Sequence, residues 1–254
     1  MLKSLFSAFL MYSRIPVPKV EWKEENRRYS LCFFPLIGAV IGVLLVLWRI
    51  VCDILAIGQL LFAAGAVLLP VLVTGGIHLD GFCDVCDARA SYADRQKRLE
   101  IMSDPHIGSF ALIKLCLYLI MQTALFAQIK DVETTAVIAC GYVLSRALSG
   151  LTAVAFRFAK AEGTLQSFVR PSHKNLTLAM EGFFIALSIA VSVLIFPVCG
   201  VFMAAAAALV LVWHRYAAYR DFGGITGDLC GWFLQMCEIS ILAAAVFAER
   251  LCAL

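Results

Sequence analysis

Residues 31–52 read LCFFPLIGAVIGVLLVLWRIVC and contain a single charged side chain, Arg49. A helix needs about 20 consecutive apolar residues to cross the hydrocarbon core of a bilayer, so this stretch predicts a membrane span. Irregular backbone and open sheet edges cannot face lipid. The sequence therefore predicts an all-α, polytopic integral membrane helix bundle of about seven transmembrane helices. The other six predicted spans are 60–77, 109–129, 134–156, 176–198, 201–218 and 232–248.

Composition agrees with a membrane protein. Of the 254 residues, 62% are apolar and only 15% are charged, whereas soluble domains carry roughly 25% charged residues. No repeat or low-complexity linker divides the chain, so we expect one membrane-embedded domain over residues 1–254. Residues 4–15 lack the small-residue cleavage site of a signal peptide, and they predict an interfacial or re-entrant helix instead.

The connections between the predicted spans alternate between two kinds. Those near 53–59, 130–133 and 197–200 are short, and those at 78–108, 157–175 and 215–231 are long and polar. With seven spans, the long connections and the N-terminal segment share one side. Most of the 21 basic residues fall in these segments. Cytoplasmic loops carry an excess of Lys and Arg, so we expect the long loops to face the cytoplasm.

The first long connection begins with the sequence GGIHLDGFCDVCD, residues 75–87. Asp80, Asp84 and Asp87 are spaced i, i+4, i+7 and share one face of a helix. Three like charges on one face repel each other unless a cation lies among them, and Mg²⁺ binds carboxylate and phosphate oxygens together. The alternative is a solvated loop in which Asp80 is a turn residue and Asp104 is a helix cap.

The third long connection contains RDFGGITGDLCG at residues 220–231. Gly224, Thr226 and Asp228 predict a flexible loop of a size that suits a phosphate group. The alternative is an ordinary glycine-rich connection in which Asp228 caps the last helix. Cys83 and Cys86 form a lone Cys-x-x-Cys without a second pair, and packing between the aspartates is the simpler interpretation.

Two cations lie within predicted spans. Arg146 is mid-span, where a charged side chain normally faces the bundle interior and pairs with an anion. Glu238 is a candidate for that partner or for part of the site. Lys114 either faces the site or extends to the membrane interface. His78 adjoins the acidic cluster, where a histidine serves as a ligand or base, or forms an interfacial hydrogen bond.

Acidic loops above a bundle with buried cations suit metal-assisted transfer of a phosphoryl group. The metal neutralises phosphate oxygens, Arg and Lys stabilise charge at the leaving group, and a carboxylate or histidine accepts the proton of the attacking hydroxyl.

The motifs resemble those of the cobalamin synthase family, the adenosylcobinamide-GDP ribazoletransferases. The resemblance extends in order over nearly the whole chain. It is carried by residues 75–87, by RLEIMSDPHIG at 98–108, Ser145-Arg146, GITGD at 224–228, FLMYSRIPVP at 9–18 and FPLIG at 34–38.

This resemblance implies a Mg²⁺-dependent, multi-pass enzyme of the prokaryotic plasma membrane. It would join α-ribazole, or its 5′-phosphate, to adenosylcobinamide-GDP and release GMP. The expected partners are these substrates and membrane lipid, with no nucleic acid, and the sequence leaves open whether the chain forms a homo-oligomer. The residues expected at the site are Asp80, Asp84, Asp87 and Asp228 for the metal, His78, Asp104 and Arg146 for catalysis, and Arg98, His106, Lys114, Gly224 and Thr226 for substrate.

The chain departs from the family pattern around Asp104. Many members have a basic residue and Ser-Arg flanking this aspartate, whereas this chain has Ser103 and Pro105-His106. A protonated His106, or Lys97, Arg98 or Lys114, would then take over the missing positive charge. At position 88, this chain has alanine where members of the family commonly have glycine.

Three other classes of membrane protein fit the sequence less well. A CDP-alcohol phosphotransferase needs Asp-Gly-x-x-Ala-Arg and two further aspartates on one helix, and this spacing is missing. A UbiA-type prenyltransferase needs two Asp-rich motifs, which 80–87 and 221–228 match loosely. A transporter commonly has inverted repeats with broken helices in matching positions, and no such pairing is visible.

Overall fold

The computed structural model describes residues 1–160 and 163–252, and within them the chain is helical, without a β-strand. The helices are α1 (Leu2–Tyr12), α2 (Glu24–Arg27), the 3₁₀ helix η1 (Leu31–Phe33), α3 (Phe34–Ile54), α4 (Gln59–Thr74), α5 (Ile77–Ala90), α6 (Arg95–Ile101), α7 (Ser109–Phe126), α8 (Val132–Ala155), α9 (Thr164–Val169), α10 (Lys174–Ile195), α11 (Pro197–Asp221) and α12 (Gly227–Cys252).

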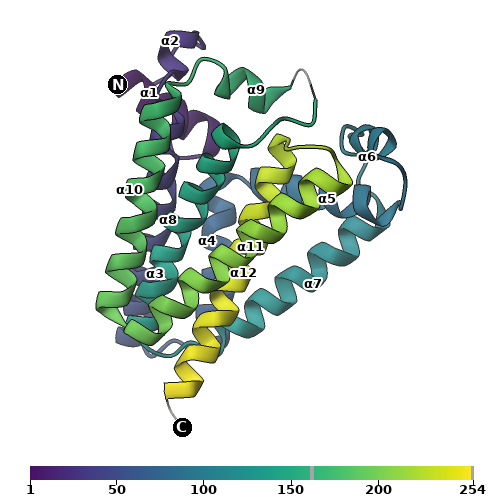
Figure 1. Cartoon of the computed structure of the whole chain (residues 1–254). Helices are drawn as coiled ribbons and strands as arrows, with labels where there is room; N and C mark the ends of the chain where they lie inside the picture. Colours follow the sequence, from purple (N-terminus) through teal and green to yellow (C-terminus); the bar gives the residue numbers. More distant parts are fainter. Residues whose placement is uncertain (161–162, 253–254) are drawn as a thin grey trace.

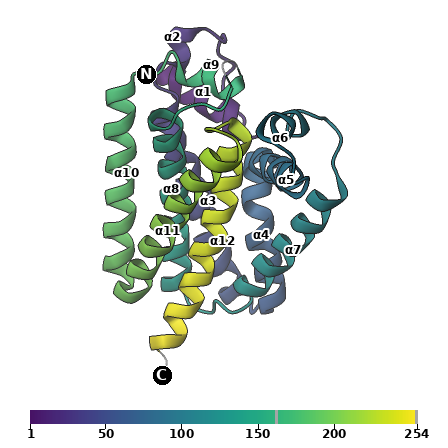
Figure 2. The same ribbon diagram turned by 45° about the vertical axis from the view of Figure 1, so that its right-hand side comes forward.

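Within the described residues, six helices are long and apolar enough to cross a membrane, and the number is seven when the bent pair α4–α5 is counted as one span. The predicted all-α membrane bundle is therefore confirmed. α10 and α7 lie on opposite sides of the bundle, with α3, α8 and α12 between them (Figure 1, Figure 2). Large apolar side chains on the outer helices, such as Ile120 and Leu194, are exposed, as expected for surfaces that face lipid.

The long connections gather at one end of the bundle, as predicted. α2, α6 and α9 lie at the end that holds the N-terminus, and the C-terminus lies at the opposite end (Figure 1). Much of the first connection is itself helical, because it forms α5 and α6.

The third connection is much shorter than the predicted 215–231. α11 continues to Asp221 and α12 starts at Gly227, so only residues 222–226 join them. The polar and aromatic residues after position 214 continue α11 beyond its apolar part. The periodicity of hydropathy in the sequence therefore does not show where α11 ends. Gly223, with φ of 81°, follows the end of α11, and such a backbone conformation suits glycine.

Glycines set the closest helix contact in the core. A Cβ on Gly38 of α3 would lie 2.3 Å from the carbonyl oxygen of Tyr142 in α8, and one on Gly42 would lie 2.7 Å from that of Ala139. Small residues four positions apart let two membrane helices approach closely. Next to this contact, Arg146 of α8 forms a buried ion pair with Glu238 of α12, which fixes α12 against α8.

Candidate active site

Two glycines turn α5 away from the bundle axis. Gly75 and Gly76 have φ of 68° and 81°, a conformation that costs other residues free energy. The chain bends by 97° between α4 and α5. The predicted span 60–77 therefore ends at Thr74, and the acidic residues lie on a separate helix.

Two acidic segments far apart in the sequence lie against each other. Gly81 of α5 packs on the start of α12, where a Cβ at position 81 would lie 2.8 Å from the Cα of Asp228. The charges of Asp80 and Asp228 both act on Asp84. The missing side chain at Gly81 thus lets the predicted acidic residues of the first and third connections meet.

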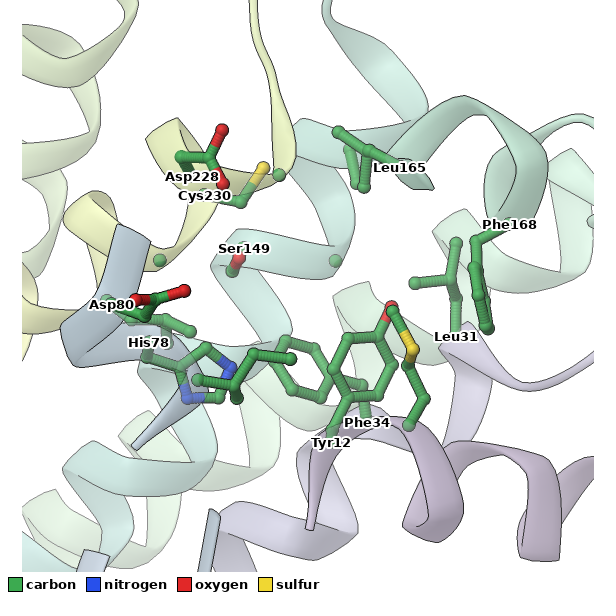
Figure 3. A pocket seen from close by; sticks show the side chains of 17 residues that line it. Tyr12, Leu31, Phe34, His78, Asp80, Ser149, Leu165, Phe168, Asp228 and Cys230 are labelled. Atoms are coloured by element: carbon green, nitrogen blue, oxygen red, sulfur yellow. The ribbon is translucent and has the colours of Figure 1, made fainter. Parts of the chain in front are cut away.

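A small cavity of about 180 Å³ opens beside these carboxylates. Asp80 and Asp228 lie on one side of it, and Tyr12 and Phe168 lie on the other (Figure 3). Its walls come from α1, η1, α3, α5, α8, α9 and α12. Segments that are distant in sequence therefore form one site next to the acidic residues.

A large cavity of about 680 Å³ lies on the other side of Asp80. Asp84, Arg14 and His106 line it together with Asp80. Met11, Ile77 and Asp80 line both cavities. Asp80 is therefore the acidic residue that borders both spaces.

Asp87 has a structural contact that the sequence did not reveal. Its carboxylate accepts hydrogen bonds from the backbone N–H groups of Gly108, at 2.5 Å, and Ala111, at 2.7 Å. These are N–H groups of the first turn of α7, which lack partners within the helix. Asp87 thus caps α7, and each of its oxygens accepts one backbone hydrogen bond.

The carboxylates of Asp80, Asp84 and Asp228 have oxygens that can bind a divalent cation. No ion pair joins Asp80, Asp84 or Asp228 to a basic side chain of the described residues. In residues 1–160 and 163–252, no group of three or more His, Cys, Asp or Glu side chains is placed to hold a metal ion. Mg²⁺ usually takes one or two carboxylates, substrate phosphates and water, so this donor set fits it.

Asp104 and His106 lie in the exposed connection between α6 and α7. The His106 Nδ1 lies 2.7 Å from Asp104 Oδ1, and the His106 backbone N–H donates to the same oxygen at 2.9 Å. This backbone hydrogen bond, followed by that of the ring, lowers the pKa of the Asp104 carboxyl below its usual value. His106 borders the large cavity, whereas Asp104 is not among its described lining residues.

Arg98 contacts a carboxylate that the sequence analysis did not single out. It lies 3.3 Å from the buried Asp221, at the end of α11. Arg89 and Arg220 also pair with Asp221, at 3.3 and 2.8 Å. Three guanidinium groups on one carboxylate join α5, α6 and α11, so Arg98 has a structural contact in addition to its predicted role toward substrate.

Residues 222–226 are held by the chain that follows α8. The Ile225 N–H donates a hydrogen bond to the Arg157 carbonyl, and the Ala159 N–H donates one to the Ile225 carbonyl, both at 2.9 Å. A Cβ on Gly224 would lie 2.6 Å from the Arg157 carbonyl oxygen. The predicted phosphate loop is therefore packed against protein at Gly224.

Thr226 and Asp228 lie at the start of α12. The Thr226 hydroxyl accepts a hydrogen bond from the Leu229 N–H at 3.2 Å and lies 3.5 Å from Asp228 Oδ2. The helix is thus capped by Thr226 rather than by Asp228, and the Asp228 carboxylate lines the small cavity.

The predicted membrane cations lie outside the two cavities. Arg146 pairs with Glu238, as one interpretation of the sequence expected, and also donates to the Tyr142 carbonyl at 3.1 Å. Lys114 is exposed near the start of α7. Neither belongs to the described lining of either cavity.

Comparison with known proteins identifies the family. A family model described as cobalamin-5-phosphate synthase matches residues 4–246. The chain belongs to this family. The resemblance seen in its motifs is confirmed, and with it the expectation of an enzyme of cobalamin synthesis.

Relatives of the cobalamin-5-phosphate synthase family match over almost their full length. A protein of Lachnoclostridium phytofermentans is 40% identical over 248 residues, which cover 98% of this chain and 95% of the relative. One of Klebsiella pneumoniae is 31% identical, covering 96% and 99%, and one of Pseudomonas fluorescens is 33% identical, covering 92% and 94%. All three are named adenosylcobinamide-GDP ribazoletransferase. No solved structure matches the chain.

Several residues of this family member reach the site without having been predicted there. Arg14 lines the large cavity, and Tyr12, Ser149 and Phe168 line the small one. Tyr12 and Arg14 belong to the N-terminal motif, so the resemblance contained a signal for them. Ser149 and Phe168 carry no local signal, because only the packing of the helices around the cavity places them there.

Proposed function

We propose that this protein is a Mg²⁺-dependent transferase that joins α-ribazole, or its 5′-phosphate, to adenosylcobinamide-GDP and releases GMP. The observation that carries the proposal is the position of Asp80 between two cavities. A transfer reaction needs a place for each of two substrates and a shared boundary where they react. The names of the relatives supply the substrates.

Asp80 and Asp84 would hold the metal, since both border the large cavity. When bound, Mg²⁺ neutralises phosphate oxygens and orients the phosphorus for attack. The negative charges of Asp80, Asp228 and Asp87 repel a negative charge on Asp84. A divalent cation bound among these carboxylates would reduce this repulsion. Asp87 contributes less than predicted, because it caps α7.

Arg14 and His106 would bind phosphate oxygens of the GDP-activated substrate. Both line the large cavity together with Asp84. Guanidinium groups suit phosphate because their N–H donors form paired hydrogen bonds. Arg14 is held in place by its backbone N–H, which donates to the Val73 carbonyl at 2.7 Å.

The attacking group would be a ribose hydroxyl of the ribazole. Its oxygen forms a bond to the phosphorus attached to cobinamide, while the bond from that phosphorus to the oxygen of the GMP phosphate breaks. Asp228, which lines the small cavity, would accept the hydroxyl proton, a role that differs from its predicted metal ligation. Arg14 would stabilise the charge on the departing GMP.

The site would face the cytoplasm. The end of the bundle that carries α6 and α9 also holds Arg95, Lys97 and Arg98 on α6 alone. Basic residues accumulate on the cytoplasmic side of membrane proteins. In a prokaryote, this side of the plasma membrane also gives access to a nucleotide-activated substrate.

The proposal is tested by the reaction itself. The purified protein in detergent is supplied with adenosylcobinamide-GDP, α-ribazole and Mg²⁺, and GMP is measured. We expect GMP release that stops with EDTA and returns with Mg²⁺. No GMP with any divalent metal would contradict the proposal, and CMP release from a CDP-alcohol would favour a phosphotransferase of that type.

Asp84→Asn tests the metal ligand. Loss of even a supporting partner of a metal ligand costs about 10–100-fold, so loss of Asp84 should lower turnover by more than about a hundredfold. Asp53→Asn is the matched control, because Asp53 pairs with Arg49 far from the cavities and turnover should stay near wild type. Thermal unfolding shows whether both variants are folded. Turnover of Asp84→Asn within a few-fold of wild type would remove Asp84 from the metal site.

A further inference from the structure

The small cavity has walls that suit a flat aromatic ring. The rings of Tyr12 and Phe34 have centroids 4.4 Å apart, and Phe168 lies 6.2 Å from Tyr12. All three line the cavity (Figure 3). Leu31 and Leu165 complete the apolar surface. Aromatic rings stabilise other rings through stacked and edge-on contacts in addition to area burial.

The size of the cavity limits what it can hold. An engineered apolar cavity of about 150 Å³ binds benzene, and this one measures about 180 Å³. It therefore accommodates one ring or a compact fused pair of rings. It is far too small for a corrinoid macrocycle, so a large part of the GDP-activated substrate lies elsewhere.

His78 is a buried polar group on the wall of this cavity, and it lacks a hydrogen-bond partner among the described residues. His78 is 5% exposed, and neither of its ring nitrogens has a hydrogen-bond partner among the described residues. Buried polar side chains are nearly always hydrogen-bonded. His78 lines the cavity and its ring lies 5.8 Å from that of Phe34. A ligand with a ring nitrogen would supply the missing partner.

The position of the carboxylates sets the orientation of such a ligand. Asp80 and Asp228 lie on the side of the cavity opposite Phe168 (Figure 3). A ring packed against Tyr12 and Phe168 would direct a sugar attached to it toward these carboxylates. The sugar hydroxyl would then lie at the boundary with the large cavity, which Asp80 shares.

We infer that the small cavity binds the aromatic base of the ribazole substrate, with His78 donating a hydrogen bond to its unsubstituted ring nitrogen. The inference rests on the proposed function, because the substrate class comes from it. A benzimidazole-type base is flat, fused and largely apolar, and it offers one such nitrogen. Guanine carries several donors and acceptors, whose burial among Phe34, Leu31 and Leu165 would leave groups unpaired at a cost in free energy.

The test measures binding of each substrate separately. Phe168→Ala removes one wall, Leu165→Trp fills the cavity, and His78→Phe keeps a ring but removes the donor. Isothermal titration with α-ribazole should show about tenfold weaker binding for each, the effect of losing one ring contact or hydrogen bond. The KM for α-ribazole should rise, whereas the dissociation constant for GDP and the KM for adenosylcobinamide-GDP stay within about twofold.

Phe183→Ala is the matched control, because Phe183 is 56% exposed on α10 and lies outside the cavity. It should change neither dissociation constant. Unchanged α-ribazole binding in both Phe168→Ala and Leu165→Trp, with GMP still released, would overturn the inference and leave the proposed function intact. Weaker GDP binding with normal α-ribazole binding would overturn it too, by assigning the cavity to guanine. Failure of the wild type to release GMP would instead contradict the proposed function.

Discussion

At the scale of single residues, the four aspartates that look alike in the sequence have different surroundings. Asp87 accepts two backbone hydrogen bonds and caps α7. Asp104 binds the exposed His106. Asp80 and Asp84 are left to border the large cavity. The four carboxylates therefore differ in the hydrogen bonds that each already makes, although the sequence presents them alike.

Arg146 and Glu238 form the buried charge pair of the bundle core. Removal of one partner from such a pair costs about 3–5 kcal/mol, because the other charge stays buried without compensation, whereas replacement of both by apolar residues is often neutral. We expect Glu238→Leu to lower the thermal unfolding temperature strongly. The double variant Arg146→Met with Glu238→Leu should recover both the unfolding temperature and most of the turnover.

The double variant separates structure from catalysis at Arg146. The sequence predicts a catalytic role, while the structure gives the guanidinium an anion and a backbone carbonyl as partners. A double variant that unfolds at the wild-type temperature but releases no GMP would show that Arg146 acts in the reaction. The measurement is thermal unfolding in detergent together with the GMP assay.

At the scale of elements, the site depends on how closely α5 approaches α12. Gly81 has no side chain at the point where the helices meet. α4 and α5 are separated by the two left-handed glycines at 75 and 76, so α5 is free to cross the end of the bundle. The acidic face of α5 is therefore positioned by three glycines that carry no chemistry of their own.

Gly81→Ala tests this contact. The new Cβ would lie 2.8 Å from the Cα of Asp228, so backbone must move and Asp228 shifts relative to Asp80. We expect turnover to fall by more than about tenfold, since a misplacement of about 1 Å costs up to a hundredfold. Gly182→Ala on α10 is the control, because a Cβ there meets no atom within 4 Å and alanine favours the helix. Equal activity of the two variants would contradict the argument.

At the scale of the whole molecule, the connections that follow α4, α8 and α11 lie at the end of the bundle that holds the N-terminus (Figure 1). The short turns after α3, α7 and α10 lie at the opposite end, whereas α6, α9 and residues 222–226 lie with the acidic residues (Figure 2). The candidate site and the segments that surround it are therefore at one end of the bundle.

Reporter fusions test this topology. Alkaline phosphatase fused after Lys130 should be active, because it follows three crossings, and green fluorescent protein fused there should be dark. Fusions after Gly163, which follow a fourth crossing, should give the reverse pattern. The same reporter active at both positions would contradict the arrangement of seven crossings.

The sequence by itself determined the membrane bundle, the side on which its long connections gather, and the acidic cluster. These follow from local properties, since the length of an apolar run and the spacing of Asp80 and Asp84 are readable without any partner. The resemblance of the motifs also identified the family.

The tertiary structure alone decided which residues share a cavity. Asp228 lies beside Asp80 only because α5 turns at Gly75 and Gly76 and meets α12, and Phe168 lies opposite them because α9 forms another wall of the same cavity. The sequence could not reveal that Asp87 caps α7 or that α11 continues to Asp221. Contacts between segments more than a hundred residues apart depend on how the helices pack, and no local pattern of hydropathy or charge specifies that packing.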